Sequence, residues 1–209
     1  MDSKPYTRNL IPGESTCWEV HRNLNGVEYR YWDPNRSKLA AFLACRGKTF
    51  PFELKSTTLY LGAASGTTVS HISDICPEGR IFAVEVAKNP FRELLAIAEK
   101  RGNIIPILED ANHPDIYERL VNQVDILYQD ISQRNQTEIF LRNANMLKPS
   151  GTGYLMVKAR CIDVVASPAS VFEKCRKDLE AVDFKILEMV KLDPHQKDHA
   201  AIVVEKPSP

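Results

Sequence analysis

Residues 59–69 have the sequence LYLGAASGTTV, in which an apolar run ends abruptly in small residues. This order is typical of a buried strand, a tight glycine turn and the N-terminus of a helix. A glycine turn lets a ligand approach the backbone closely, and the free N–H groups of a helix N-terminus favour an anionic or polar group. The stretch therefore predicts a ligand-binding turn at 62–66, although a plain tight turn explains it equally well.

Strands and helices alternate on both sides of this turn. The alternation implies a mostly parallel sheet with helices on both faces. Only 193–199 separate the last two strands, too few residues for a crossover helix, so these strands should pair antiparallel. The predicted strands are 57–63, 80–86, 103–109, 124–130, 152–159, 185–192 and 200–205, and the helices that follow 86, 130 and 159 are expected near 89–98, 136–147 and 167–182. A Rossmann-like, seven-stranded, mostly parallel sheet with an antiparallel last strand resembles the α/β fold of class I methyltransferases.

The N-terminal stretch has a different pattern. Residues 18–21 and 27–32 alternate in polarity around Asn25-Gly26, which is a strong hairpin signal. An apolar stripe from Leu39 predicts a helix that stops near Gly47, and 48–56 look like a connector. We expect a small β-rich region with a connecting helix at 1–55 and the α/β domain at 56–209.

Four aromatic residues of this region have two possible roles. Trp18, Tyr29, Tyr31 and Trp32 could stack on nucleobases. The simpler interpretation is an ordinary β core with a few surface rings.

Composition limits the function classes. The chain has 27 Lys plus Arg and 27 Asp plus Glu, which argues against nucleic-acid binding by bulk charge but leaves a local basic patch open. The 5 cysteines are scattered and never form a C-x-x-C pair, so they predict reduced thiols and no metal site. No apolar signal core or bilayer-spanning stretch is seen, so we expect a cytoplasmic protein with no membrane partner.

Polar residues close several of the predicted strands. In an open α/β sheet, ligands bind outside the carboxyl ends of the strands. Glu85 follows Gly66 at about the 20-residue spacing of a carboxylate that binds ribose hydroxyls, unless it caps a helix. Asp110 suits an adenine amino group or a helix cap, and Lys158 is either a positioned cation or a surface lysine. A lone histidine such as His199 is usually structural. Glu85, Asp110 and Lys158 nevertheless fall, together with Asp130 and His199, at the same predicted edge of the sheet.

Four separate motifs resemble one family. Residues 36–41 (RSKLAA), 61–71 (LGAASGTTVSH), 103–111 (NIIPILEDA) and 198–200 (DHA) are similar to fibrillarins, the RNA 2′-O-methyltransferases of box C/D ribonucleoproteins. The similarity runs from the N-terminal hairpin to the last strand. The Gly/Arg-rich tail of eukaryotic members is absent, so the chain looks like the compact archaeal form.

The resemblance implies a catalytic set of Lys38, Asp130, Lys158 and His199, with Lys158 kept near Asp130. Two positions depart from the family pattern, Ser132 in the stretch DISQ and Arg160 after Lys158-Ala159. The implied cofactor is S-adenosylmethionine, which needs no metal because a sulfonium carries its methyl group. Glu85 is expected on its ribose, Asp110 and Ala111 at the adenine, and Thr67 and Thr68 near the methionine carboxylate. The full cofactor set comprises Gly62, Ala63, Ala64, Ser65, Gly66, Thr67, Thr68, Glu85, Val86, Asp110, Ala111, Asp130 and Gln133.

The resemblance also implies partners. A scaffold protein of the Nop5/Nop56/58 type, an L7Ae-type protein and a box C/D guide RNA would present substrate rRNA or tRNA to this catalytic subunit. A small phosphate patch is expected from Arg36, Lys38, Arg134, Arg160 and Lys197, with weak RNA binding by the chain alone.

Three alternatives remain. One is a methyltransferase of the same fold with a non-RNA acceptor, and another is a scaffold subunit that has kept the fold without the reaction. A nicotinamide dehydrogenase would share the glycine turn and the acid, but the missing G-x-G-x-x-G motif and the antiparallel last pair disfavour it.

Overall fold

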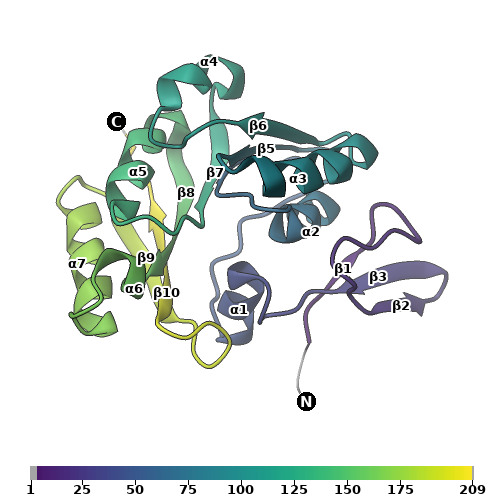
Figure 1. Cartoon of the computed structure of the whole chain (residues 1–209), viewed down its shortest axis with the longest axis horizontal. Helices are drawn as coiled ribbons and strands as arrows, with labels where there is room; N and C mark the ends of the chain where they lie inside the picture. Colours follow the sequence, from purple (N-terminus) through teal and green to yellow (C-terminus); the bar gives the residue numbers. More distant parts are fainter. Residues whose placement is uncertain (1–3, 209) are drawn as a thin grey trace.

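The computed structural model describes residues 4–208, so residues 1–3 of the N-terminal stretch assessed above for a signal sequence lie outside it. Its main feature is a seven-stranded sheet in the order β6-β5-β4-β7-β8-β10-β9 (Figure 1). Neighbours from β6 to β8 are parallel, and β10 is antiparallel to both β8 and β9. The predicted sheet and its antiparallel end are confirmed. The strands are β4 (Thr57–Leu61), β5 (Arg80–Glu85), β6 (Ile104–Leu108), β7 (Val124–Gln129), β8 (Leu147–Lys158), β9 (Lys185–Lys191) and β10 (His199–Glu205).

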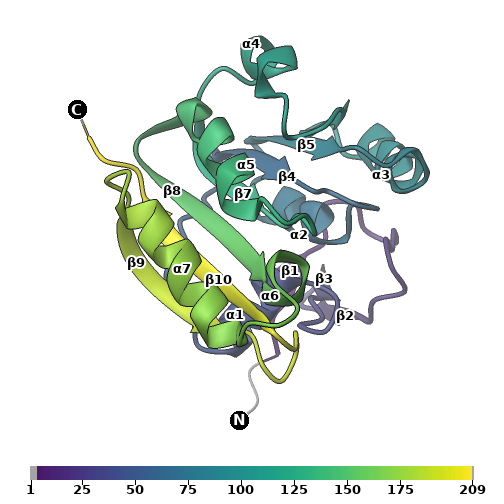
Figure 2. The same ribbon diagram turned by 60° about the vertical axis from the view of Figure 1, so that its left-hand side comes forward.

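Helices cover both faces of this sheet, as Figures 1 and 2 show. Alternate residues of each strand point to opposite faces, so Leu59 and Leu61 join one core while Tyr60 joins the other. The first core includes α5 (Gln136–Asn143) and α7 (Pro168–Glu180), and the second includes α1 (Lys38–Ala44), α2 (Thr67–Ile75) and α3 (Lys88–Lys100). Two short helices, α4 (Glu118–Val121) and α6 (Ala159–Ile162), complete the fold with 3₁₀ turns at Pro114–Ile116 and Ala144–Met146.

The helix expected at 136–147 is shorter than predicted. It ends at Asn143, and β8 already begins at Leu147. The buried Asn143 amide donates to the carbonyl oxygens of Ala111 and Ile139 and accepts from the Tyr117 hydroxyl. These bonds fix the end of the helix, and Pro149 and Gly151, residue types that often end helices, lie within β8.

The N-terminal region forms a separate antiparallel sheet of β1 (Tyr6–Arg8), β2 (His21–Leu24) and β3 (Val27–Tyr31) in the order β1-β3-β2. The predicted Asn25-Gly26 turn is present, and both residues have positive φ. The prediction that a strand starts at residue 18 is wrong, because β2 begins at His21. The Glu19 carboxylate accepts from the backbone N–H groups of Thr16 and Cys17, which turns the chain before the strand.

A buried charge network joins this small sheet to α2. The Asp74 carboxylate accepts from Arg30 of β3 at 2.7 Å, from Arg101 at 2.7 Å and from the Thr7 hydroxyl at 2.7 Å. The Arg30 and Asp74 side chains are fully buried, and Arg30 also pairs with Glu19. Next to it, His71 stacks on the Trp32 ring, and burial lowers the pKa of His71 to about 3. Charged groups buried in this way are stable only when paired, so the network fixes the small sheet against the large one.

The connecting helix α1 packs into the large domain. Ser37 caps it by accepting from the Ala40 N–H, and Leu39–Phe42 are buried in the second core. Residues 45–56 contain no helix or strand, as expected for a connector. The division at residue 55 stays a prediction. None of the helices between residues 4 and 208 is long and apolar enough to cross a bilayer.

Candidate active site

The glycine turn after β4 lies against the end of β7. Gly62 has φ +80°, and a Cβ there would lie 2.3 Å from the Asp130 carbonyl oxygen, so only glycine lets the two strand ends approach this closely. Gly66 has φ +88° and begins α2 without a side chain to cap it. The turn therefore brings Asp130 to the N-terminus of α2.

Glu85 is bound to this turn. It closes β5, and its Oε2 accepts from the Ala64 N–H at 2.8 Å while Oε1 accepts from the Ala87 N–H at 2.8 Å. A carboxylate has about four acceptor sites, so each oxygen can still accept from a ligand hydroxyl. Glu85 is thus a rigidly placed acceptor, as the ribose role requires.

Asp110 is held by a neighbour that the sequence did not reveal. Its Oδ1 accepts from the backbone N–H and the amide of Asn112, and these bonds hold the pKa of Asp110 below its usual range. The Asn112 amide also donates to Gln133 Oε1 at 3.0 Å, and Asn135 donates to Asn112 Oδ1 at 2.9 Å. The loops after β6 and β7 are therefore locked together, and the short spacing of Asp110 and Asn112 was the only sequence signal for it.

Eight of the predicted cofactor residues line a single cleft of about 320 Å³, named here the Glu85 cleft. They are Gly62, Ala64, Glu85, Val86, Asp110, Ala111, Asp130 and Gln133.

The other predicted cofactor residues lie elsewhere. Ala63, Ser65, Thr67 and Thr68 line an adjoining cleft with Lys38 and Asp130, named here the Lys38 cleft. The Thr68 hydroxyl donates to Ser37 Oγ at 3.0 Å, so it supports α1 rather than facing the cleft freely. Gly66 lines neither cleft and instead faces Leu94 and Ile97 of α3.

Lys38 and Asp130 form a tight ion pair between the two clefts. The Lys38 Nζ donates to Asp130 Oδ1 at 2.6 Å and to Oδ2 at 2.9 Å, and the side chains are 16% and 19% exposed. Lys38 is thus the hydrogen-bonded partner of the carboxylate, and the nearness of Lys158 to Asp130 stays a prediction. Among the described residues, Lys158 forms no ion pair of its own.

Lys158 and His199 are brought together by strand register. They lie directly opposite each other as the last residue of β8 and the first of β10, and opposite residues have neighbouring Cβ atoms. The His199 Nδ1 lies 2.6 Å from the Lys197 carbonyl oxygen, so Nδ1 carries a proton and Nε2 has the free lone pair.

The pKa of His199 depends on its burial and on the charged groups around it. Burial lowers the pKa of His199, and the Lys38 and Lys158 cations lower it further, while the Lys197 carbonyl and the Asp130 carboxylate oppose this. Lys38, Asp130 and Lys158 therefore all act on the charge state of His199. His199 is consequently neutral at pH 7.

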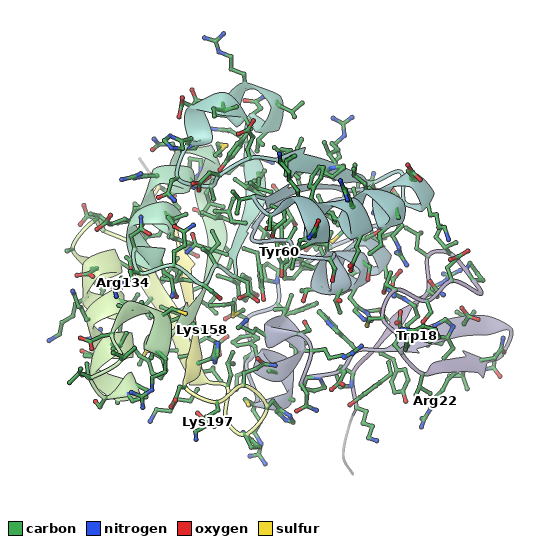
Figure 3. The ribbon with its side chains drawn as sticks, viewed as in Figure 1. Trp18, Arg22, Tyr60, Arg134, Lys158 and Lys197 are labelled. Atoms are coloured by element: carbon green, nitrogen blue, oxygen red, sulfur yellow. The ribbon has the colours of Figure 1, made fainter. Side chains whose placement is uncertain are left out.

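The expected phosphate patch is only partly free. Arg160 pairs with Asp198 at 3.1 Å and donates to the Val164 carbonyl, and Arg36 donates to the Cys17 carbonyl. Figure 3 shows Arg134, Lys158 and Lys197 on the same part of the molecule, near the start of β10. Ser132, the other departure from the family pattern, lines both clefts. Between residues 4 and 208, no group of three His, Cys, Asp or Glu residues is placed to hold a metal ion.

Comparisons with known proteins agree on one family. The fibrillarin family profile matches residues 1–208. A relative from Thermococcus sibiricus, named fibrillarin-like rRNA/tRNA 2′-O-methyltransferase, is 46% identical over 96% of this chain and 89% of its own.

Solved structures give the same result. The Methanococcus jannaschii fibrillarin pre-rRNA processing protein has a TM-score of 0.94 at 41% identity, covering 98% of this chain and 89% of its own. Aeropyrum pernix fibrillarin with natively bound S-adenosyl-L-methionine has a TM-score of 0.89 at 43% identity, and the match covers 96% of this chain and 88% of its own. A chain of a fibrillarin/Nop5p complex has a TM-score of 0.89 at 42% identity, and the match covers 99% of this chain and 95% of its own. The sequence motifs, the fold and these matches together show that the chain belongs to the fibrillarin family.

Proposed function

We propose that this chain is the S-adenosylmethionine-dependent RNA ribose 2′-O-methyltransferase of a box C/D ribonucleoprotein, with rRNA and tRNA as substrates. One observation carries the proposal. Lys38 and Asp130 form an ion pair in the Lys38 cleft, next to the Glu85 cleft, and Lys158 and His199 lie opposite each other at the end of β8 and the start of β10. The names of the relatives support it.

The Glu85 cleft suits the cofactor. Its volume lies in the usual range for ligand pockets. Glu85 would accept from the ribose hydroxyls, the Asp110–Asn112 segment would contact the adenine, and the turn before α2 would receive the carboxylate. When bound, the cofactor supplies an electrophilic methyl group.

The four catalytic side chains act on the acceptor hydroxyl. A ribose hydroxyl is a poor nucleophile, so it must be aligned and relieved of its proton. The free Nε2 of neutral His199 can accept a hydrogen bond from the ribose. The Lys158 ammonium can stabilise negative charge that develops on the oxygen, and the Asp130 carboxylate holds Lys38 in place for the same purpose.

The RNA would be delivered by partners. With equal numbers of acidic and basic residues, the chain lacks the excess positive charge of a protein that binds RNA strongly by itself. A Nop5-type scaffold, an L7Ae-type protein and a box C/D guide RNA would form the complex, in the cytoplasm. The fibrillarin/Nop5p complex supports the first of these partners.

The decisive experiment measures methyl transfer from labelled S-adenosylmethionine to a guide-matched RNA, with and without the partner proteins, and maps the modified atom. Product on the 2′-oxygen in the assembled complex alone is expected. Cofactor binding and assembly without transfer would indicate a scaffold subunit, and transfer to another acceptor would indicate a methyltransferase of different specificity.

Substitution of Glu85 by alanine is expected to weaken cofactor binding by about 10- to 100-fold. The change removes hydrogen bonds from hydroxyls to a charged acceptor, each worth about 1.5–3 kcal/mol. Calorimetric titration with S-adenosylmethionine measures the effect. Glu99→Ala, on the exposed side of α3, is the control and should bind normally. Equal affinities for the two variants would remove Glu85 from the site.

Methyl transfer is expected to slow as the solution becomes acidic, with a midpoint below pH 6.5. The folded-state pKa of His199 lies below its ordinary 6.5, so Nε2 stays unprotonated at neutral pH and is lost as an acceptor only below that value. Single-turnover rates from pH 5 to 8 test this. In the His199→Gln variant, the residual rate should no longer fall at acidic pH. If it falls as in the parent chain, the pH dependence comes from another group.

A further inference from the structure

Trp18 is the most conspicuous surface residue outside the two clefts. Its side chain is 97% exposed, although tryptophan is normally well buried. Its φ is +61°, a left-handed conformation that is an outlier for a bulky residue. The other tryptophan of the chain, Trp32, is 2% exposed and stacks on His71. Trp18 is therefore held in a strained, outward position without an internal packing role, and such strain concentrates at functional sites.

The loop that carries Trp18 is firmly held. The Glu19 carboxylate is 2% exposed, pairs with Arg30 and accepts from the N–H groups of Thr16 and Cys17. From the other side, the Arg36 guanidinium donates to the Cys17 carbonyl. The ring is consequently presented from an ordered backbone rather than from a mobile loop.

The ring lies next to the catalytic residues. It lines a cleft of about 330 Å³, named here the Trp18 cleft, together with Tyr31, Arg36 and Thr67. Arg36 and Thr67 also line the Lys38 cleft, so the two clefts share a wall. In the view of Figure 3, Trp18 and Arg22 lie at the small sheet, across α1 from Lys158. A ligand in the Lys38 cleft that extends past Arg36 would reach Trp18.

The charges around this path favour a polyanion. Within 4–36, the four carboxylates Glu14, Glu19, Glu28 and Asp33 are all at least partly buried. The charged residues of this segment that are classed as exposed are all basic, namely Lys4, Arg8, Arg22 and Arg36. An exposed ring beside exposed arginines suits a strand of nucleic acid, in which bases stack and phosphates pair with cations.

We propose that Trp18 is a stacking platform for a nucleobase of the RNA that enters the Lys38 cleft, with Arg36 beside it. The inference rests on the proposed function, and it adds a positioning residue in the loop before β2. Stacking would hold the RNA so that the target ribose stays between Lys158 and His199. Because every base has a π face, this contact is independent of sequence.

Two substitutions isolate the ring. Trp18→Gly removes it and suits the positive φ, so this variant should fold at least as well as the parent chain. Trp18→Phe keeps a stacking surface. In the assembled complex, Trp18→Gly is expected to lower the single-turnover rate by about 5- to 100-fold, the range that base–aromatic stacking supplies, and Trp18→Phe should restore most of it. Affinity for S-adenosylmethionine should not change.

A photochemical measurement tests contact without needing turnover. RNA carrying 5-iodouridine at successive positions around the target is irradiated in the complex, and the tryptic peptide 9–22 is analysed. Trp18 is the only aromatic ring among Trp, Tyr and Phe in that peptide, so an adduct there identifies it. The adduct should disappear in Trp18→Gly.

The outcomes are separable. An adduct at Trp18 with no methyl transfer by the unsubstituted chain would overturn the proposed function and support the RNA contact. Absence of the adduct at every position, with full activity of Trp18→Gly, would overturn the contact. If Trp18→Gly weakens only the association with the scaffold protein, the ring belongs to a protein interface and the inference is wrong.

Discussion

Replacement of Lys158 by methionine is expected to slow methyl transfer by about 10²- to 10⁴-fold, the range for loss of one group that assists proton movement or stabilises charge. Methionine keeps an unbranched, flexible side chain and removes the ammonium. Asp130 is bonded to Lys38, so Lys158 is the cation that remains to approach the acceptor oxygen from β8. Loss of this charge should act on the reacting state and leave cofactor affinity unchanged.

The measurement is the single-turnover rate with saturating cofactor and guide-paired RNA. Lys148→Met is a matched control, because Lys148 lies at the other end of the same strand and pairs with Asp125. The control should react at the parent rate. A rate for Lys158→Met within threefold of the control would exclude Lys158 from the chemistry and leave Lys38 as the relevant cation.

Substitution of Asp74 by alanine is expected to lower the free energy of unfolding by about 3–5 kcal/mol, the cost of breaking a buried ion pair on one side. The variant removes one carboxylate partner from each of two buried arginines, since Arg30 is fully buried and Arg101 is 3% exposed. Arg30 keeps Glu19 as a partner, whereas Arg101 loses its only carboxylate among the described residues. The damage should fall on the junction between the small sheet and α2.

Urea unfolding measures this effect, and hydrogen exchange locates it. Amides of β1 and β3 should exchange faster than those of β7 in the variant. The control is Glu78→Ala, because Glu78 pairs with Lys55 at 3.7 Å on the surface and surface pairs contribute about 0–1 kcal/mol. A loss below about 1 kcal/mol for Asp74→Ala would show that water enters and solvates the freed arginines.

Much of the site follows from position along the chain. The carboxyl ends of parallel strands share one edge, so Glu85, Asp110 and Asp130 could be placed together from their positions at the ends of apolar runs. The Asn25-Gly26 turn was predictable because its conformation demands these residue types.

Side-chain pairing was not predictable in the same way. Lys38 and Asp130 are 92 residues apart, and no local pattern says that this lysine rather than Lys158 reaches the carboxylate. The buried Arg30–Asp74 pair escaped prediction because charged residues are normally assigned to the surface. The false strand start at Trp18 has a related cause, since the Glu19 carboxylate overrides the alternating pattern by binding the backbone.

The order of the strands along the chain also means that the Glu85 cleft and His199 are made at different times during synthesis. The Glu85 cleft takes all of its lining from residues 62–133, whereas His199 begins the last strand, which inserts between β8 and β9. A chain still on the ribosome has therefore made every residue of the cofactor cleft long before it has made the histidine opposite Lys158. The proposed catalytic set is therefore complete only after synthesis has reached β10.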